Sequence, residues 1–220
     1  MVTRGISFNN THSYYDLNLI LSASEITPAE PKTNYVDIPG ADSSADLTEA
    51  HGEVKFSDRE CSFTFTMNPA DELTDAAFEE KKTEVSNLLN GKECKITLDK
   101  DADFYYLGRC TVSEYLSDRR LKQIVVTARV HPYKFKQDIT TVEERLSEVA
   151  KELTIKNGRK SVVPVIKCTH KNTMIVFKNA TFNLSAGQHK ILDIQFVEGK
   201  NIVTVSGEGA VTFTFQEGEL

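Results

Sequence analysis

Apolar and polar residues alternate along most of the chain, which is typical of strands that bury one face. In the first part of the chain the pattern predicts strands at 61–67, 95–98, 104–112 and 123–130. In the second part it predicts strands at 162–166, 174–177, 181–184, 191–196, 202–205 and 211–215. Many short strands at close, regular spacing predict a mainly β protein built from sandwiches or barrels.

Two segments follow a helical spacing instead. Between Thr74 and Asn90 the apolar residues fall on one face of a helix, and Gly91 follows as a stop. These apolar residues are Phe78, Val85, Leu88 and Leu89. The segment 142–149 is a weaker helix candidate with capping-box spacing before it, and it also fits an edge strand. Both interpretations of 142–149 stay open.

Prolines and glycines mark the loops. Residues 25–33 contain Pro28 and Pro31, so this segment is expected to be extended and outside any central strand. Pro164 likewise makes 162–166 a candidate edge strand. Gly207-Glu208-Gly209 predicts a hairpin turn rather than a phosphate-binding loop, because no Lys-Ser/Thr follows it.

The segment Ile38-Pro39-Gly40-Ala41 predicts a type II turn, with proline fixing φ at the second position and glycine allowing a positive φ at the third. Ser43, Ser44 and Asp46 then follow, and their side chains can hydrogen-bond nearby backbone and hold the loop in a defined shape. The sequence thus predicts a shaped, acidic loop between two extended segments.

Charge narrows the possible partners. The 220 residues have a net charge of −6, and residues 139–220 hold ten Lys and Arg against nine Asp and Glu. Residues 1–138 therefore hold 16 against 23, a net charge of −7. Nucleic-acid binding needs cations that neutralise phosphates, so this part of the chain is not expected to bind DNA. The N-terminal segment also has no long apolar run, and export by a signal peptide is not expected.

No motif for catalysis, a cofactor or a metal is found. Cys61, Cys94, Cys110 and Cys168 form no C-x-x-C pair and are expected to be buried, reduced thiols. The histidines form no zinc motif, and G-x-S-x-G is absent. Asp99-Lys100-Asp101-Ala102-Asp103 copies the start of a calcium loop, but Phe104 replaces the required glycine, so a turn is expected. Tyr14, Tyr15, Tyr105 and Tyr106 are expected to be half-buried at core edges.

Several of these pieces occur in an order that resembles a known family. They are "GISFNNTHSYYDLNL", "VDIPGADSSADLTE", "CSFTFTM", "NLLNGKECKITLD", "FYYLGRCTV" and "HPYKF", which together span residues 5–135. In this order they resemble the distal tail proteins (Dit) of long-tailed siphophages. The second part resembles that family's galectin-like domain more loosely, through "IKNGRKSVVPVIKC", "LSAGQHKILDIQF" and "GKNIVTVSGEGAVTFTF". Ala41-Asp42-Ser43-Ser44 departs from the family, where many members carry Arg and Gly.

The resemblance implies a fold and a domain division. Residues 1–138 are expected to form a ring-building domain, a β-sandwich or split-barrel-like structure with one helix. Residues 139–220 are expected to form a galectin-like β-sandwich. Galectin-like describes only a fold here, and a fold does not carry sugar binding with it.

The resemblance also implies a structural role, without catalysis or a cofactor. The chain is expected to form a hexameric ring, single or double, that joins the tail tube protein to a tail-associated tip protein and leaves a channel through which DNA passes. A receptor-binding protein is a further expected partner, and the location is the virion tail after assembly in the cytoplasm of the host bacterium. The candidate inter-subunit loop consists of Ile38, Pro39, Gly40, Asp46, Leu47, Thr48 and Glu49.

Other functions remain open on the sequence alone. The alternative to a ring is a carbohydrate-binding adhesion module of a tail or prophage-derived particle, with tyrosines as stacking platforms. A different tube-forming tail protein is a third hypothesis. An enzyme would require a site assembled entirely from residues far apart in the sequence.

Overall fold

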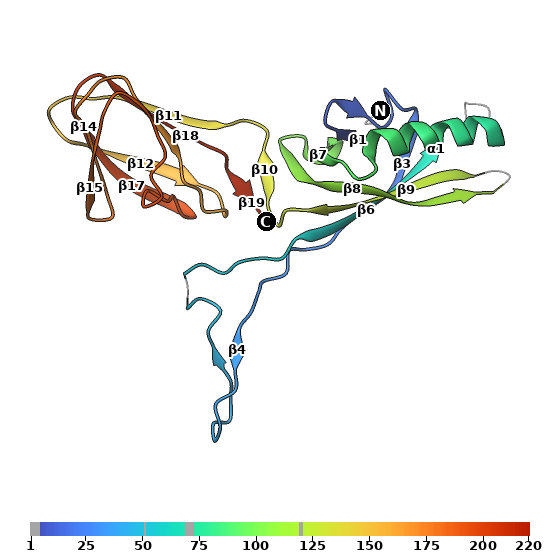
Figure 1. Cartoon of the computed structure of the whole chain (residues 1–220), viewed down its shortest axis with the longest axis horizontal. Coiled ribbons are helices and arrows are strands. Elements are labelled where there is room, and N and C mark those ends of the chain that lie inside the picture. The colour runs from blue at the N-terminus through green and yellow to red at the C-terminus, as the bar shows by residue number, and fades with distance from the viewer. Residues whose placement is uncertain (1–4, 51, 69–72, 119–120) are drawn as a thin grey trace. The chain divides into compact units, whose positions relative to one another are not determined.

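The computed structural model describes residues 5–50, 52–68, 73–118 and 121–220, and most of its elements are strands (Figure 1). The chain divides into two compact units, unit 1 (residues 1–134) and unit 2 (residues 135–220). The described residues form one α-helix and many strands, so the predicted mainly β fold class with one helix is confirmed. Within the described residues, no helix is both long and apolar enough to cross a membrane. The division at residues 134 and 135 lies close to the expected boundary near 138.

Unit 1 is built on one antiparallel sheet with the strand order β2-β1-β7-β8-β9-β6-β3. Its end strands do not pair with each other, so this path is open and does not close into a barrel. The bounds are β1 Ile6–Phe8, β2 Thr11–His12, β3 Leu19–Ile26, β6 Arg59–Met67, β7 Glu93–Leu98, β8 Phe104–Ser117 and β9 Lys122–Val130.

The helix α1 (Asp75–Leu89) covers one face of this sheet (Figure 1). It begins where the Thr74 hydroxyl accepts a hydrogen bond from the Ala77 N–H, and it ends before Gly91, which has a φ of +76°. Phe78, Val85 and Leu89 are buried and join the strand residues in one core. The predicted helix is confirmed, and its spacing alone identified the buried face.

The core of unit 1 follows directly from the alternation in the sequence. Phe63 and Phe65 on β6 point to the helix side, where Phe8 packs against both rings at centroid distances of 6.2 and 6.0 Å. Cys61, Cys94 and Cys110 are buried as free thiols in the same core, and Cys168 is buried in unit 2. The expectation of buried, reduced cysteines is therefore confirmed. Burial also raises the pKa of the Cys61 thiol to about 11.

Unit 2 is a β-sandwich of two four-stranded antiparallel sheets, ordered β11-β18-β13-β16 and β12-β17-β14-β15. Buried residues from both sheets share one core around Phe196, whose ring contacts Phe177, Phe213 and Phe215. The bounds are β11 Thr140–Arg145, β12 Lys151–Asn157, β13 Val165–Cys168, β14 Thr173–Phe177, β15 Ala180–Leu184, β16 Gly187–His189, β17 Gly199–Ser206 and β18 Ala210–Phe215. The short strands β10 (Lys134–Lys136) and β19 (Gly218–Glu219) pair with each other.

Two predictions about edges are decided by this topology. The segment 142–149 is a strand at its start, because β11 ends at Arg145 and lies at the edge of its sheet, so the helix alternative is wrong. The predicted edge strand at 162–166 is also wrong. Pro164 comes just before β13, and this strand lies between β18 and β16. A proline directly before a strand removes no hydrogen bond from the ladder.

Two further predictions in unit 2, one of a strand and one of a hairpin turn, are wrong. The segment 191–196 is not a strand, although Ile194 and Phe196 are fully buried; only Phe196 forms an isolated bridge, to Val162. Gly207-Glu208-Gly209 is not a hairpin turn, because it joins β17 and β18, which belong to different sheets. Gly207 has a φ of +128°, and a Cβ there would collide with the Asn172 carbonyl. This glycine is needed for the crossing between sheets.

The close pairing of β8 and β9 gives a test of the unit 1 sheet. A Cβ at Gly108 would lie 2.5 Å from the Val130 Cα and would also meet the Arg129 backbone. We expect Gly108→Ala to lower the free energy of unfolding of unit 1 by about 1–3 kcal/mol, because the two strands must separate locally. All seven tyrosines lie in unit 1 and the chain has no tryptophan, so tyrosine fluorescence during denaturation reports on unit 1 alone.

The matched control is Thr111→Ala, an exposed position on the same strand, for which a change below about 1 kcal/mol is expected. Equal effects of the two substitutions would contradict the close strand contact.

Candidate functional site

The segment between β3 and β6 forms a long two-stranded ribbon, residues 27–57, which we call the arm (Figure 1). Its two sides are joined by backbone hydrogen bonds along its length. Thr27 N–H donates to the Glu60 carbonyl, Lys32 N–H to Lys55, and Leu47 N–H to Asn34, at 3.0, 2.7 and 2.8 Å. Near the tip, β4 (Tyr35–Val36) pairs with β5 (Ala45–Asp46). The two proline-containing and acidic segments found in the sequence are thus part of one element.

The tip of the arm has the predicted turn. The Ala41 N–H donates to the Ile38 carbonyl at 3.0 Å, and Gly40 has a φ of +84°. This hydrogen bond and the positive φ at the third position are those of a type II turn, so the prediction from Pro39-Gly40 is confirmed. A left-handed φ at this position favours glycine over any other residue.

Side chains near the tip fix the arm's shape from within. The Asp46 carboxylate accepts a hydrogen bond from the Thr48 N–H at 2.9 Å, and the Thr48 hydroxyl accepts one from the Asn34 N–H at 3.0 Å. Hydrogen bonds from the Thr48 hydroxyl, the Thr48 N–H and the Tyr35 hydroxyl lower the pKa of Asp46 below its ordinary value. Ser44 bonds the Asp37 side chain rather than backbone, which corrects the capping role expected for it.

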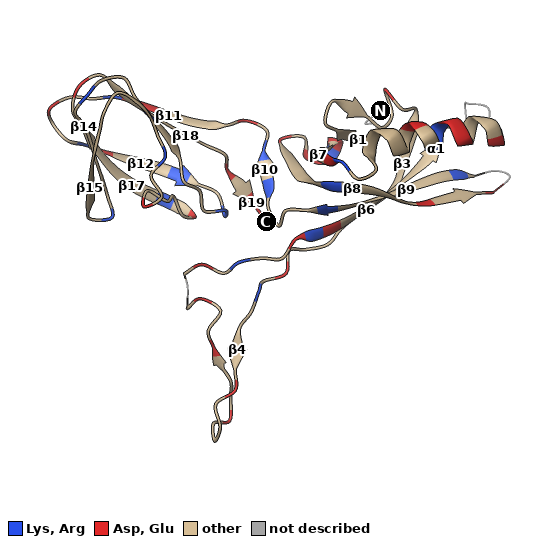
Figure 2. Cartoon of the chain, in the orientation of Figure 1, with Lys and Arg blue, Asp and Glu red and all other residues tan. Residues whose placement is uncertain are grey.

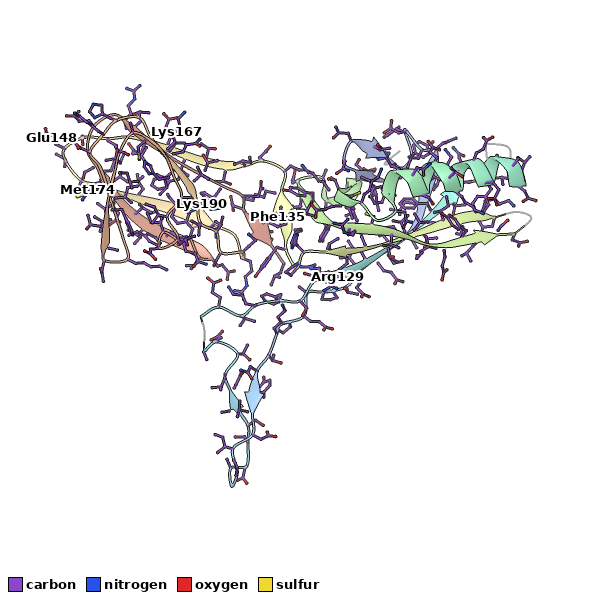
Figure 3. All side chains as sticks on the ribbon, in the orientation of Figure 1. Arg129, Phe135, Glu148, Lys167, Met174 and Lys190 are labelled. Atoms are coloured by element: carbon purple, nitrogen blue, oxygen red, sulfur yellow. The ribbon has the colours of Figure 1, made fainter. Side chains whose placement is uncertain are left out.

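The surface of the arm carries exposed apolar side chains together with acidic ones. None of its described residues is buried, and Figure 3 shows side chains projecting from both sides of the arm. The exposed fractions are 60% for Tyr35, 43% for Val36, 52% for Ile38 and 42% for Leu47. By sequence, residues 27–57 hold six Asp and Glu against two Lys, and acidic residues follow one another along the ribbon in Figure 2.

The structure brings all the predicted loop residues together on this arm. Ile38, Pro39 and Gly40 form the tip turn, Asp46 and Thr48 form the internal hydrogen bonds, and Leu47 is exposed beside Glu49. Their role between subunits stays a prediction. Sequence reasoning missed Tyr35 and Val36 as exposed apolar residues, because the residues before Pro39 were interpreted only as the end of an extended segment. The prolines on one side were the available signal that this strand leaves the sheet.

A second feature lies at the base of the arm, on the face of the sheet opposite α1. There a hollow of about 670 Å³ is lined by residues of β3, β6, β7, β8 and β9. Arg109 and Arg129 stand directly opposite each other in the ladder, with Glu93 beside Arg109 and Glu60 beside Arg129. The guanidinium of Arg129, which is labelled in Figure 3, also donates to the Asp58 carboxylate at 2.9 Å. Acidic and basic side chains are thus interleaved across the open hollow.

The side chains of Cys61 and His12 take part in the packing and hydrogen bonding of unit 1. Cys61 lines the hollow, but its raised pKa keeps it a protonated thiol at neutral pH. His12 lies 3.2 Å from the Asp99 carboxylate, yet its Nδ1 accepts N–H bonds from Tyr14 and Tyr15, so this nitrogen has no free lone pair to act as a base.

Two aspartates of the segment that resembles the start of a calcium loop, Asp99 and Asp101, also make structural contacts. Asp99 accepts a hydrogen bond from the Gly5 N–H at 2.8 Å, and Asp101 pairs with Lys134 at 2.8 Å. Asp99–Asp101 form a short 3-10 turn between β7 and β8, which agrees with the predicted turn. In the described parts of the chain there is no group of three or more His, Cys, Asp or Glu side chains that could hold a metal ion.

The tyrosine pairs differ from what the sequence predicted. Tyr106 is buried, and Tyr14 and Tyr105 are half-buried. Tyr15 is 70% exposed, which contradicts the expectation of a half-buried residue at a core edge. Its ring stacks on the His12 imidazole at a centroid distance of 4.6 Å, so a neighbouring ring rather than burial orients it.

Comparisons with known proteins bear on the fold. No family model matches the chain, and no curated protein matches it. Among solved structures, the chain is similar to the crystal structure of the Dit (gp 19.1) protein of SPP1, described as a paradigm of the hub adsorption apparatus in phages that infect Gram-positive bacteria. The TM-score is 0.70 over 99% of both chains, at 12% sequence identity. The chain shares the fold of this protein. At that identity the likeness extends to the fold alone.

The Asp46 hydrogen bonds predict a pH dependence of the arm. Because the pKa of Asp46 is lowered in the folded chain, these bonds stabilise the tip above the ordinary Asp range and are lost as the pH falls through the lowered pKa. NMR titration of the side-chain carboxyl should give a midpoint below the ordinary value. Thr48→Val, which removes the hydroxyl, should raise that midpoint, whereas Ser43→Ala should not. A midpoint at or above the ordinary Asp value would disprove the hydrogen-bonded arrangement.

Proposed function

We propose that this protein is a structural component of a phage tail hub, and that it assembles into a ring through its arm. The observation that carries the proposal is the arm itself, which has a defined shape, exposed apolar and acidic side chains, and no buried residue among those that the structure describes. The fold shared with a phage Dit protein supports the tail location, and the ordered sequence pieces that resemble the distal tail family agree with it.

The physical argument concerns what keeps such an arm in place. Its strands β4 and β5 are two residues long each, and an isolated two-stranded hairpin is at best marginally stable in water. Tyr35, Val36 and Ile38 lie close together in the sequence, and the hydrogen bond from the Leu47 N–H to the Asn34 carbonyl brings Leu47 to the same part of the arm. Exposed apolar side chains gathered in this way mark interaction sites in soluble proteins. Contact with a second copy would remove this surface from water and hold the arm.

In the proposed assembly six copies form a ring, single or back to back, between the end of the tail tube protein and a tail-associated tip protein. A receptor-binding protein is a further proposed partner. DNA would pass through the channel without binding, and the net charge of −7 over residues 1–138 favours a surface that repels phosphates. The role is structural, with no catalytic step, and the location is the virion tail after assembly in the host cytoplasm.

A carbohydrate-binding module is the second candidate, and the exposed Tyr15 is the observation that favours it. Unit 2 gives it no support. The sequence of residues 135–220 has no Trp or Tyr, and every Phe in it is buried or half-buried, so unit 2 offers no exposed ring for stacking on a sugar. Binding to a panel of cell-wall glycans that is lost in Tyr15→Ala would favour this candidate over the ring.

The ring can be tested with the purified chain. Light scattering over a concentration series, with negative-stain images of the same fractions, should show six copies of the 24.6 kDa chain, about 148 kDa, as particles with a central hole. A mass twice as large would indicate back-to-back rings. A strict monomer at every concentration would contradict a ring that forms by itself.

The arm's part in the ring requires variants that keep unit 1 folded. Val36→Ser, Ile38→Ser and Leu47→Ser together should reduce the assembly to monomers, because they remove the exposed apolar surface of the arm without touching the core. Tyrosine fluorescence during denaturation should be unchanged. The matched control is Val149→Ser with Leu192→Ser, which are 78% and 76% exposed in unit 2. If the arm variant still forms the ring, the arm is not the inter-subunit element.

A further inference from the structure

One sheet of unit 2 has an outward surface whose charges are not balanced. Lys156 on β12 and Lys200 on β17 are direct partners in the antiparallel ladder, and both are exposed. Like charges directly opposite each other on neighbouring strands are destabilising. Neither lysine has an acidic partner among the described residues, which include the whole of unit 2.

Apolar side chains lie next to the two lysines on the same surface. Ile202, two residues beyond Lys200, is 55% exposed and stands opposite Thr154. Val176 and Met174 on β14 continue the surface, since both alternate with buried residues of their strand. The outward side chains Lys156, Lys200, Thr154, Ile202, Met174 and Val176 are called the lysine face below. Glu152, at the far end of β12, is the acidic residue on this side.

The arm has the complementary character. Asp42 and Glu49 are exposed, and neither makes an ion pair or side-chain hydrogen bond with any described residue. The Asp46 carboxylate, by contrast, already accepts a hydrogen bond from the Thr48 N–H. Ile38 and Leu47 lie close in sequence to these free carboxylates and are themselves exposed. Among the described residues, Asp42 and Glu49 of the arm therefore have no partner and lie near apolar side chains, and the same holds for the two lysines of the lysine face.

We propose that the arm of one copy docks on the lysine face of unit 2 of a second copy. The contact pairs Asp42 and Glu49 with Lys156 and Lys200, and it buries Ile38 or Leu47 against Ile202. This relieves the repulsion between the two lysines and covers both exposed apolar surfaces. An extended chain rises about 3.3 Å per residue, so the 15 residues from Thr27 to Ala41 reach up to about 50 Å. The inference rests on the proposed function, since it names the surface that receives the arm.

Photo-crosslinking of the full chain tests the contact directly. The variant Tyr35→p-benzoylphenylalanine keeps an aromatic ring at an exposed arm position. A mixture of nitrogen-15-labelled and unlabelled copies is irradiated, and crosslinked peptides are identified by mass spectrometry. The expected result is a mixed-isotope crosslink between the arm and residues 152–156 or 199–204. Crosslinks within one chain, to any other surface, or none at all would overturn the inference.

Charge exchange provides a second, independent test. Lys156→Glu with Lys200→Glu should weaken self-association at least about tenfold, because the arm's carboxylates then meet like charges. Adding Asp42→Lys and Glu49→Lys to the same chain should restore it. The matched control is Lys167→Glu with Lys171→Glu, which changes the charge equally at exposed positions outside the lysine face and should leave association unchanged (Figure 3 labels Lys167).

The outcomes separate this inference from the proposed function. Rings of normal mass that contain the Lys156→Glu and Lys200→Glu changes would overturn the docking surface and leave the ring intact. Loss of assembly without restoration by the arm lysines would also overturn the proposed pairing. A wild-type chain that stays monomeric and gives no crosslink between copies would contradict both.

Discussion

The arm, residues 27–57, has no hydrophobic core of its own, and the proposed function depends on this constraint. Residues 27–57 are held by hydrogen bonds between the arm's own two sides and by the Asp46–Thr48 interactions, but no described side chain in them is buried. Folding the backbone of each residue costs about 1–2 kcal/mol in conformational entropy, and hydrophobic burial is the main term that offsets it. Because the described residues of the arm are at most half-buried, this term is small within the arm, and contact with a second copy in the proposed assembly would add to it.

Unit 1 is arranged to hold the base of this arm rigidly. The arm leaves the sheet where β3 and β6 are paired over most of their length, and β6 is paired on its other side with β9. Arg59 donates to the Pro132 carbonyl at 2.7 Å, and Phe56 contacts the Tyr133 ring at a centroid distance of 6.0 Å. The "HPYKF" segment, which closes the first part of the sequence, thus anchors the arm's return side. A rigid base limits the entropy lost when the tip meets a partner.

How far the sequence predicts this structure depends on the range of the interactions. Local patterns gave the α1 helix, the type II turn at Pro39-Gly40 and most strands, because periodicity and turn chemistry act within a few residues. They did not show that 27–33 and 52–57 are two sides of one arm, since pairing of distant segments leaves no local signal. The segment 191–196 failed for a related reason: Phe196 is apolar because it fills the sandwich core, not because it belongs to a ladder. In unit 2, Lys156 and Lys200 could be paired only once the register was known.

The excess of acidic residues on the arm limits the contacts that it can make in the proposed assembly. A contact of arm against arm would bring together two ribbons that each carry six acidic residues against two lysines. Such a contact is repulsive, and the proposed docking of the arm on a different surface avoids it. Contacts between two different surfaces can be reciprocal in a two-fold dimer, or they can propagate from copy to copy and close into a ring where the rotation allows it. Residues 1–138 carry −7 and residues 139–220 carry +1, so the acidic part of one copy meets less repulsion from the second part of its neighbour than from the first. In the proposed assembly this asymmetry would favour contact between the arm of one copy and unit 2 of its neighbour.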